Sequence, residues 1–388
     1  MENKVLFIKN CQLVLENGIM WDAALIAVNG IITEYGKEKD MTAPEGAVIV
    51  DGKGKYLGPG FVDLHVHAYG KERFIDKPVW VARQYLKHGT TTILASPWYR
   101  LDLETFLTAI ETVRREMPNA PTLRGLYMEG PYTNPKYGSH ARLNPWGHGI
   151  VEEEYRALVD AAGDLAKVWA IAPELANIRN FVKYAREVYP DTVFAVGHSE
   201  ATPAEIRALG SKYLPTLETH ATNATGQTNR LNGIVGTGPD EYCLTAPEVY
   251  CELISDSTAI HVKPDIQRLL LHAKGVDKMV LITDGSNSAG DPPEKFAHIT
   301  DINFSPFGEV SGSKLTMNVA CRNVMSHTRV GITEAFIMAS RNPARVIGLD
   351  HEIGTIDCGK RADLVLVDDR FNVDTVIFDG EVCNFEED

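Results

Sequence analysis

Pro59-Gly60-Phe61-Val62-Asp63-Leu64-His65-Val66-His67 is the stretch that decides the fold. An apolar run that follows Pro-Gly is typical of a buried strand. Side chains alternate along a strand, so His65 and His67 point to the same face at its end. Two neutral imidazoles placed in this way can bind one transition metal, although such a pair also occurs as a hydrogen-bonded core feature.

The overall composition limits the classes of function. The 388 residues carry a formal net charge of −14, which argues against a nucleic acid or an anionic membrane as partner. No apolar run approaches the ~20 residues of a membrane span, and the N-terminus has no secretory pattern. The six cysteines are scattered without a C-x-x-C pair, as is typical of reduced thiols. We therefore expect a cytoplasmic protein.

The middle of the chain alternates apolar strands with amphipathic helices, the pattern of a parallel sheet. Eight strands are predicted, at 61–67, 91–97, 123–129, 168–174, 193–198, 214–220, 250–255 and 279–284. Eight such repeats fit a (β/α)8 TIM barrel over residues 57–345. Short strands and hairpin turns occupy residues 1–56 and 346–388, and both chain ends are predicted to form one small β-sandwich domain.

Potential metal ligands stand where the predicted strands end, which is the active-site face of such barrels. They are His65, His67, Glu129, His198, His220 and Asp284. So many polar groups at one rim would be costly to bury without a partner. Imidazole and carboxylate ligands suit zinc, iron, manganese or cobalt. We expect one or two divalent metal ions per subunit, zinc before the others.

The chain resembles the amidohydrolase superfamily, and within it the N-acetylglucosamine-6-phosphate deacetylase family, over nearly its whole length. The matching motifs include P-G-F-V-D-L-H-V-H, Y-M-E-G-P-Y-T-N-P-K-Y-G-S-H, V-G-H-S, T-H-A-T-N-A, L-I-T-D-G and V-S-G-S-K-L-T-M. The resemblance implies that Glu129, His198 and His220 hold the principal metal. It implies that His65 and His67 admit a second metal, with Glu129 bridging the two.

The resemblance also implies an activity, the metal-dependent hydrolysis of N-acetylglucosamine 6-phosphate to glucosamine 6-phosphate and acetate in amino-sugar catabolism. Asp284 is expected to act as general base and then general acid, with a helix N-cap as its alternative role. His140 is expected to approach the acyl group. The expected contacts to the sugar phosphate are Asn223, Ala224, Arg230 and His261. Arg230 is expected to act across a homodimer.

Departures from the family pattern fall on the substrate side. The segment between Asp256 and His261 is longer than the family's D-G-x-H, the residues after His220 read A-T-N-A-T-G, and Arg230 aligns only with a one-residue shift. A related N-acyl amino sugar, such as N-acetylgalactosamine 6-phosphate, therefore remains an alternative substrate. A non-catalytic scaffold is disfavoured because all six ligands are present, and a deaminase because of the E-G-P and G-S-H segments.

Overall fold

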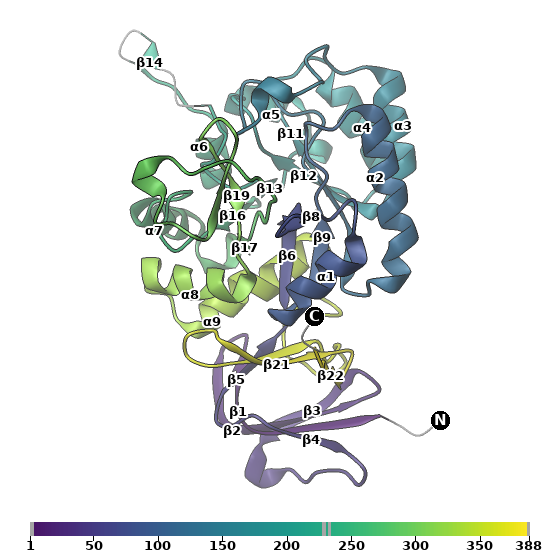
Figure 1. Cartoon of the computed structure of the whole chain (residues 1–388), viewed down its shortest axis with the longest axis vertical. Coiled ribbons are helices and arrows are strands. Elements are labelled where there is room, and N and C mark those ends of the chain that lie inside the picture. The colour runs from purple at the N-terminus through teal and green to yellow at the C-terminus, as the bar shows by residue number, and fades with distance from the viewer. Residues whose placement is uncertain (1–3, 227–229, 232–233, 386–388) are drawn as a thin grey trace.

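The computed structural model describes residues 4–226, 230–231 and 234–385. It has two parts, a helix-covered barrel and a smaller β domain to which both ends of the chain contribute (Figure 1). The expected TIM barrel with a β domain from both chain ends is therefore confirmed.

The barrel is a sheet of eight parallel strands. In sheet order they are β6 (Phe61–Val66), β9 (Thr90–Ala95), β10 (Leu123–Met128), β11 (Ala166–Ile171), β12 (Val193–Val196), β13 (Leu217–Glu218), β16 (Tyr250–Ile254) and β17 (Met279–Ile282). The last strand meets the first, because the backbone N–H of Asp284 donates to the carbonyl of His65 at 3.0 Å. Apolar side chains such as Val62, Leu94 and Val280 fill the interior, so the barrel is a packed core rather than a pore.

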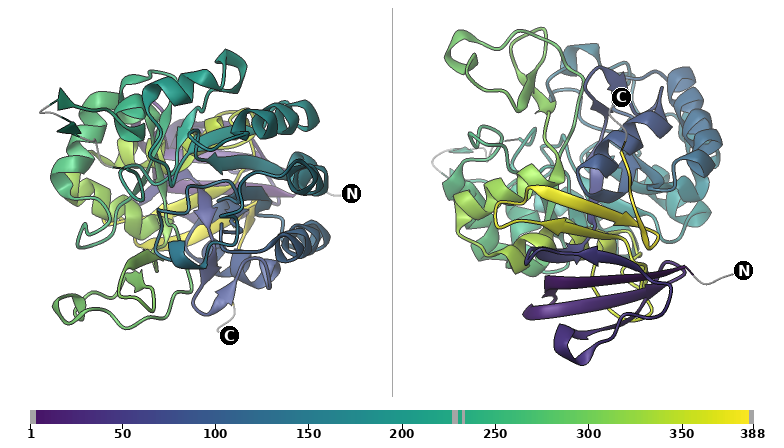
Figure 2. Two further views of the ribbon diagram at one scale, coloured as in Figure 1. Left: turned by 90° about the horizontal axis from the view of Figure 1, so that it is seen from above. Right: turned by 60° about the horizontal axis from the view of Figure 1, so that its bottom comes forward.

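Helices cover the outside of the barrel (Figure 2). They are α1 (Pro78–Lys87), α2 (Leu103–Glu116), α3 (Glu152–Ala162), α4 (Ile178–Val188), α5 (Pro203–Ala208), α6 (Pro239–Thr245), α7 (Pro264–Lys274), α8 (Met317–Thr328), α9 (Ile332–Phe336) and α10 (Asn342–Val346), with a π-helical turn at Ile337–Arg341 between the last two. Each buries an apolar face: Phe181 of α4, for example, packs edge-on against Trp169 of β11, with ring centres 5.1 Å apart. The sequence periodicity of these segments follows from that one-sided burial.

The second sheet has the order β22–β21–β20–β5–β1–β2–β3, with β4 on β1. Its strands are β1 (Val5–Leu15), β2 (Gly18–Val28), β3 (Ile31–Lys37), β4 (Val48–Asp51), β5 (Tyr56–Pro59), β20 (Leu364–Val367), β21 (Val373–Phe378) and β22 (Glu381–Val382). In the right-hand view of Figure 2 the purple N-terminal strands lie beside the yellow C-terminal ones. Strand β5 pairs with β20 as far as Pro59, so it belongs to this sheet. The predicted boundary after residue 56 would have placed most of strand β5 in the barrel.

Two local features differ from the expected strands. β13 is only Leu217–Glu218, because a 3-10 turn at Ser211–Tyr213 precedes it and the backbone of His220 turns to a φ of 29°. After β17 an unpredicted hairpin, β18 (Ile302–Phe304) and β19 (Val310–Ser313), folds back over the barrel mouth. The side-chain amide of Asn303 fixes the position of that hairpin by donating hydrogen bonds to the carbonyls of Ser286 and Ser313.

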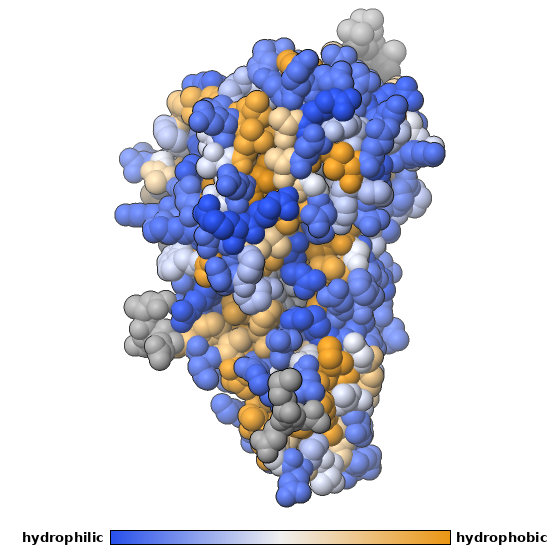
Figure 3. Space-filling model, turned by 90° about the vertical axis from the view of Figure 1, so that its right-hand side faces the viewer, coloured by the Kyte–Doolittle hydropathy of each residue, from blue (hydrophilic) through white to orange (hydrophobic). Residues whose placement is uncertain are grey.

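Three short hairpins complete the description of the strands. Besides β18–β19 these are β7 (Ala68–Tyr69) with β8 (Glu72–Arg73), and β14 (Arg230–Leu231) with β15 (Ile234–Val235). The face in Figure 3 is mostly hydrophilic, with patches of hydrophobic residues between the hydrophilic ones. Within the described part of the chain, no helix is both long and apolar enough to cross a membrane.

Candidate active site

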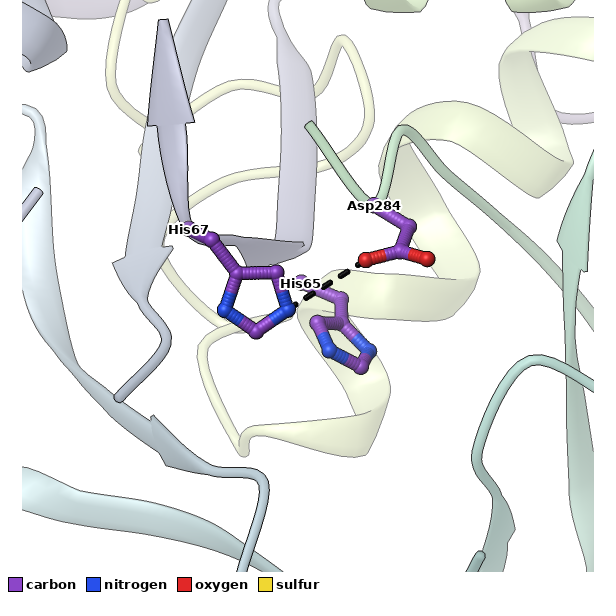
Figure 4. A group of neighbouring side chains, drawn as sticks. All are labelled: His65, His67 and Asp284. Carbon is purple, nitrogen blue, oxygen red and sulfur yellow. Dashed lines mark ion pairs between the residues drawn. The ribbon is translucent and has the colours of Figure 1, made fainter. Parts of the chain in front are cut away.

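The six predicted ligands converge at the carboxyl ends of the barrel strands. They form two groups in which one possible ligand atom per residue lies within 4.8 Å of the others: His65, His67 and Asp284, and Glu129, His198 and His220. Figure 4 shows the first group, with the Nε2 of His67 3.3 Å from the Oδ1 of Asp284. All six residues are at least nine-tenths buried. The rim that the strand pattern predicted is therefore one continuous cluster.

Glu129 lies between the two groups. Its Oε1 is 2.8 Å from the Nε2 of His198 and 3.2 Å from that of His220. Its Oε2 is 3.4 Å from the Nε2 of His67. Its Oε1 is also 3.6 Å from the Nε2 of His65. The carboxylate is thus within reach of both groups, as a bridging carboxylate must be.

Three ligands have a left-handed backbone, which non-glycine residues rarely adopt. The φ values are 47° at His198, 29° at His220 and 48° at Asp284. Such a conformation costs an L-residue roughly 1–2 kcal/mol. Each ligand comes two residues after the last residue of its strand. The turn therefore directs the side chain inward over the barrel mouth, at a cost that the rest of the fold offsets.

Neighbouring groups orient the histidines. His67 holds its Nδ1 2.7 Å from the carbonyl of Ser96, an acceptor that keeps a proton on Nδ1 and turns Nε2 towards the cluster. Glu252, buried in β16, accepts from the backbone N–H of His220 at 3.0 Å and has its Oε2 3.4 Å from the Nδ1 of His65. These contacts aim Nε2 atoms at the centre of the cluster.

The cluster fits a divalent metal. The buried Nε2 of His65 has no hydrogen-bond partner among the described residues. The Nε2 atoms of His198 and His220 lie 3.1 Å apart, and a cation between them would satisfy both lone pairs at once. The set of imidazoles and carboxylates is one that zinc, iron, manganese or cobalt accepts.

Both carboxyls of the cluster are ionised. Burial alone would raise the pKa of Glu129, but His198 and His67 hold that pKa well below its usual range. Burial likewise opposes ionisation of Asp284, and the hydrogen bond from His67 with the charge of His65 lowers its pKa nevertheless. Asp284 can therefore accept a proton at neutral pH.

A cavity of about 320 Å³ opens directly above the cluster. Its walls include four of the predicted substrate residues, namely His140, Asn223, Ala224 and His261. Arg230 lies in β14, and its side chain is outside the part that the structure describes. Apart from His65 and Arg230, all the predicted site residues therefore line this one cavity.

His140 is held neutral beside the metal ligands. Burial, and then the charge of Arg100, lowers the pKa of His140 to about 4. Its Nδ1 lies 2.9 Å from the hydroxyl of Ser139, so Nε2 is the ring nitrogen left for a ligand. Gly138 makes this approach possible: at its φ of +110° a Cβ would lie 2.4 Å from the Tyr99 hydroxyl. The local G-S-H sequence is therefore explained by close packing.

The lengthened segment before His261 is wound around one carboxylate. Asp256 accepts from the backbone N–H groups of Thr258, Ile260 and His261, and its Oδ2 lies 3.0 Å from the His261 Nδ1. Burial alone would raise the pKa of Asp256, but the hydrogen bond with His261 lowers that pKa. The Nε2 of His261, buried at the cavity wall, has no partner within the described chain. The extra residues thus fix the ring of His261 through its Nδ1 and leave its Nε2 for a ligand.

Sequence reasoning missed several residues of the site. Glu252 carried a signal, a charged residue inside the buried strand Tyr250–Ile254. The cavity is also lined by loop and hairpin residues that no periodic pattern marks in the sequence. They are Trp98, Tyr99, Arg100, Ser139, Ser286, Ser288 and Ser311. The hydroxyl of Ser311 is 2.9 Å from that of Ser139 and 2.7 Å from that of Ser288, so a chain of serines leads to His140.

Comparisons with known proteins show the family and the fold of this chain. The model of the Amidohydrolase family matches residues 56–383. The N-acetylgalactosamine-6-phosphate deacetylase of Escherichia coli is 27% identical over 96% of this chain and 98% of its own length. The N-acetylglucosamine-6-phosphate deacetylase of Haemophilus influenzae is 26% identical over 96% and 97%. The crystal structure of the latter enzyme from Pasteurella multocida superimposes with a TM-score of 0.85 at 24% identity, covering 98% of this chain and 99% of that one, which shows the shared fold.

Proposed function

Because this chain belongs to the amidohydrolase family, we propose that it hydrolyses the N-acetyl group of N-acetylglucosamine 6-phosphate, giving glucosamine 6-phosphate and acetate. One observation carries this: His140 and Asp284 line the same cavity as the metal ligands Glu129, His198 and His220. Deacetylases that align along nearly the whole chain support the choice of substrate. The relative that acts on N-acetylgalactosamine 6-phosphate makes that sugar the second candidate.

Each residue of the site has a role in this reaction. Glu129, His198 and His220 would hold the principal metal, and His65, His67 and Asp284 would offer ligands to a second. A bound divalent metal supplies Lewis acidity, which brings the pKa of water towards neutrality and polarises a carbonyl. Zinc is our first choice, with iron, manganese and cobalt as alternatives.

Two side chains of the protein, Asp284 and His140, transfer or donate protons in the reaction. Asp284 takes a proton from the attacking water and passes it to the departing amine nitrogen, so that the C–N bond breaks to a neutral amine. His140 donates from Nε2 to the acyl oxygen, and Ser139 holds its other nitrogen. His261, Asn223 and Ala224 bind the phosphate on the far wall. The strand β19 of the hairpin β18–β19 forms part of the cavity wall.

We further propose a homodimer in the cytoplasm. Strand β14 lies away from the barrel body in Figure 1, which supports a role for Arg230 in a partner's site. Four of the six cysteines are buried and none is paired in the described chain, as suits a reducing compartment.

Turnover of a substrate panel tests the proposed activity. Metal-loaded protein is given N-acetylglucosamine and N-acetylgalactosamine, each with and without the 6-phosphate, and acetate and free amine are measured. We expect release from at least one phosphorylated sugar, and the ratio of kcat/KM values for the two sugars decides between the candidates. Release from neither phosphorylated sugar would sink the proposal.

A further inference from the structure

Arg100 lines the cavity, and its guanidinium has no hydrogen bond or ion pair within the described residues. It follows β9 by five residues and lines the cavity together with His67 and His140. Its Cζ lies 4.0 Å from the ring centre of Trp98, and Trp98 packs against the ring of the metal ligand His67 at 4.9 Å. The guanidinium is therefore held in a set position beside the cluster.

Two other arginines of this chain with little exposed surface have anionic partners, whereas the half-buried Arg186 donates to the carbonyl of Pro190. Arg341 pairs with Glu16 and Asp277, and Arg361 pairs with Asp363. For Arg100 the described residues provide no hydrogen bond and no ion pair. Glu309, which also lines the cavity, is exposed at its mouth and makes no ion pair with Arg100 in the described structure.

The position of Arg100 in the barrel separates it from the expected phosphate contacts. In barrel order β9 is the second of the eight strands. The sixth strand is β13, which precedes Asn223 and Ala224, and the seventh is β16, which precedes His261. The second and sixth strands of a closed eight-stranded barrel stand on opposite sides. A substrate that spans the cavity over the metal cluster would therefore present its acyl end to Arg100 when its phosphate lies near His261.

We propose that Arg100 binds an anionic oxygen group of the substrate on the β9 side of the cavity. A guanidinium offers parallel N–H donors to a carboxylate or a phosphate. The inference rests on the proposed amide hydrolysis and deepens it. The position favours a carboxylate on the acyl group, as in an N-succinyl amino sugar; the same chemistry would also hold the phosphate of a substrate bound the other way round.

Three variants test the proposal. Arg100→Met keeps the length and the packing on Trp98 but removes the charge, and Arg100→Lys keeps the charge without the fork of donors. Arg142→Met is the matched control, because the exposed Arg142 also stacks on an aromatic ring, that of Phe307 at 4.7 Å, outside the cavity wall. The substrates are N-acetylglucosamine 6-phosphate, its N-succinyl analogue and unphosphorylated N-acetylglucosamine.

The kinetic outcomes separate the two sources of the anion. If the acyl group carries it, the wild type prefers the succinyl compound and Arg100→Met abolishes that preference, raising the KM for it about tenfold or more. If the phosphate is bound there, the same variant raises KM only for phosphorylated compounds. In either case Arg100→Lys retains part of the effect. Equal changes for all three compounds, or no change, would overturn the proposal.

Binding to metal-free protein gives a readout that does not depend on turnover. Calorimetric titration with inorganic phosphate and with succinate should show about tenfold weaker binding of one of them to Arg100→Met than to wild type, and unchanged binding to Arg142→Met. Equal affinities in wild type and Arg100→Met would overturn the proposal. Failure of the proposed function would instead appear as wild-type protein that binds the anion but hydrolyses no phosphorylated amide.

Discussion

Replacing Asp284 by asparagine should separate proton transfer from metal binding. The amide keeps the shape of the carboxylate and a contact to His67, whose Nε2 lies 3.3 Å from Oδ1, but it cannot accept a proton. General acid–base catalysis contributes about 10²–10⁴-fold. We therefore expect kcat to fall by that factor, equivalent to a barrier higher by roughly 3–5 kcal/mol. The group of Glu129, His198 and His220 is untouched, so its metal should remain.

The assay is acetate release from the best panel substrate as a function of pH, with metal content measured by elemental analysis on the same samples. Because the pKa of Asp284 is lowered, wild-type activity should decline only as pH falls through that low pKa, and the residual activity of the variant should lack this decline. Glu309→Gln, the same change at the exposed mouth of the cavity, should leave kcat unaltered. An Asp284→Asn enzyme within about threefold of the wild-type rate would refute the role of Asp284 as base.

Three further predictions concern the cluster and its surroundings. Replacing His65 and His67 together by asparagine should reduce bound divalent metal from two equivalents to one, and unchanged stoichiometry in elemental analysis would contradict a second site. Glu252→Gln should weaken metal affinity about 10–100-fold in chelator competition, because it loosens His65 and His220; equal affinity would disprove this orienting role. The pKa of His140 lies near 4, below its ordinary 6.5, so the unfolded chain binds an extra proton between these pH values. The free energy of unfolding of metal-free protein should therefore fall between pH 6.5 and pH 4. The fall should be larger than in His140→Asn by on the order of 1–3 kcal/mol. Urea titrations that show the same fall in both proteins would contradict this prediction.

The metal cluster could be predicted from the sequence because strand ends are visible there. Parallel strands of a barrel end at one rim, so a histidine or carboxylate after each apolar run can be placed without knowing the connections. His198 and Asp284 are such residues. Their left-handed backbone could not be foreseen, since nothing local to V-G-H-S or L-I-T-D-G requires it.

The substrate side depends on loops, and there the sequence was less informative. Arg100 follows an irregular S-P-W-Y segment with no periodicity, and its importance appears only when the barrel places it beside His67. The hairpin β18–β19 has strands of three and four residues, too short for an alternating pattern to stand out. Its Ser311 reaches His140 through Ser139, a contact across 172 residues between the serines that no local rule predicts.

The pairing of β5 with β20 bears on how the protein is made. Pro59 lies opposite Leu364, so a chain leaving the ribosome carries β5 with an open edge until nearly all of it has been synthesised. The last metal ligand, Asp284, emerges earlier. The barrel can therefore assemble first, and closure of the small sheet is the final step. A chain that stops short of β20 would present a bare strand edge, the kind of surface that promotes aggregation and marks incomplete products for degradation.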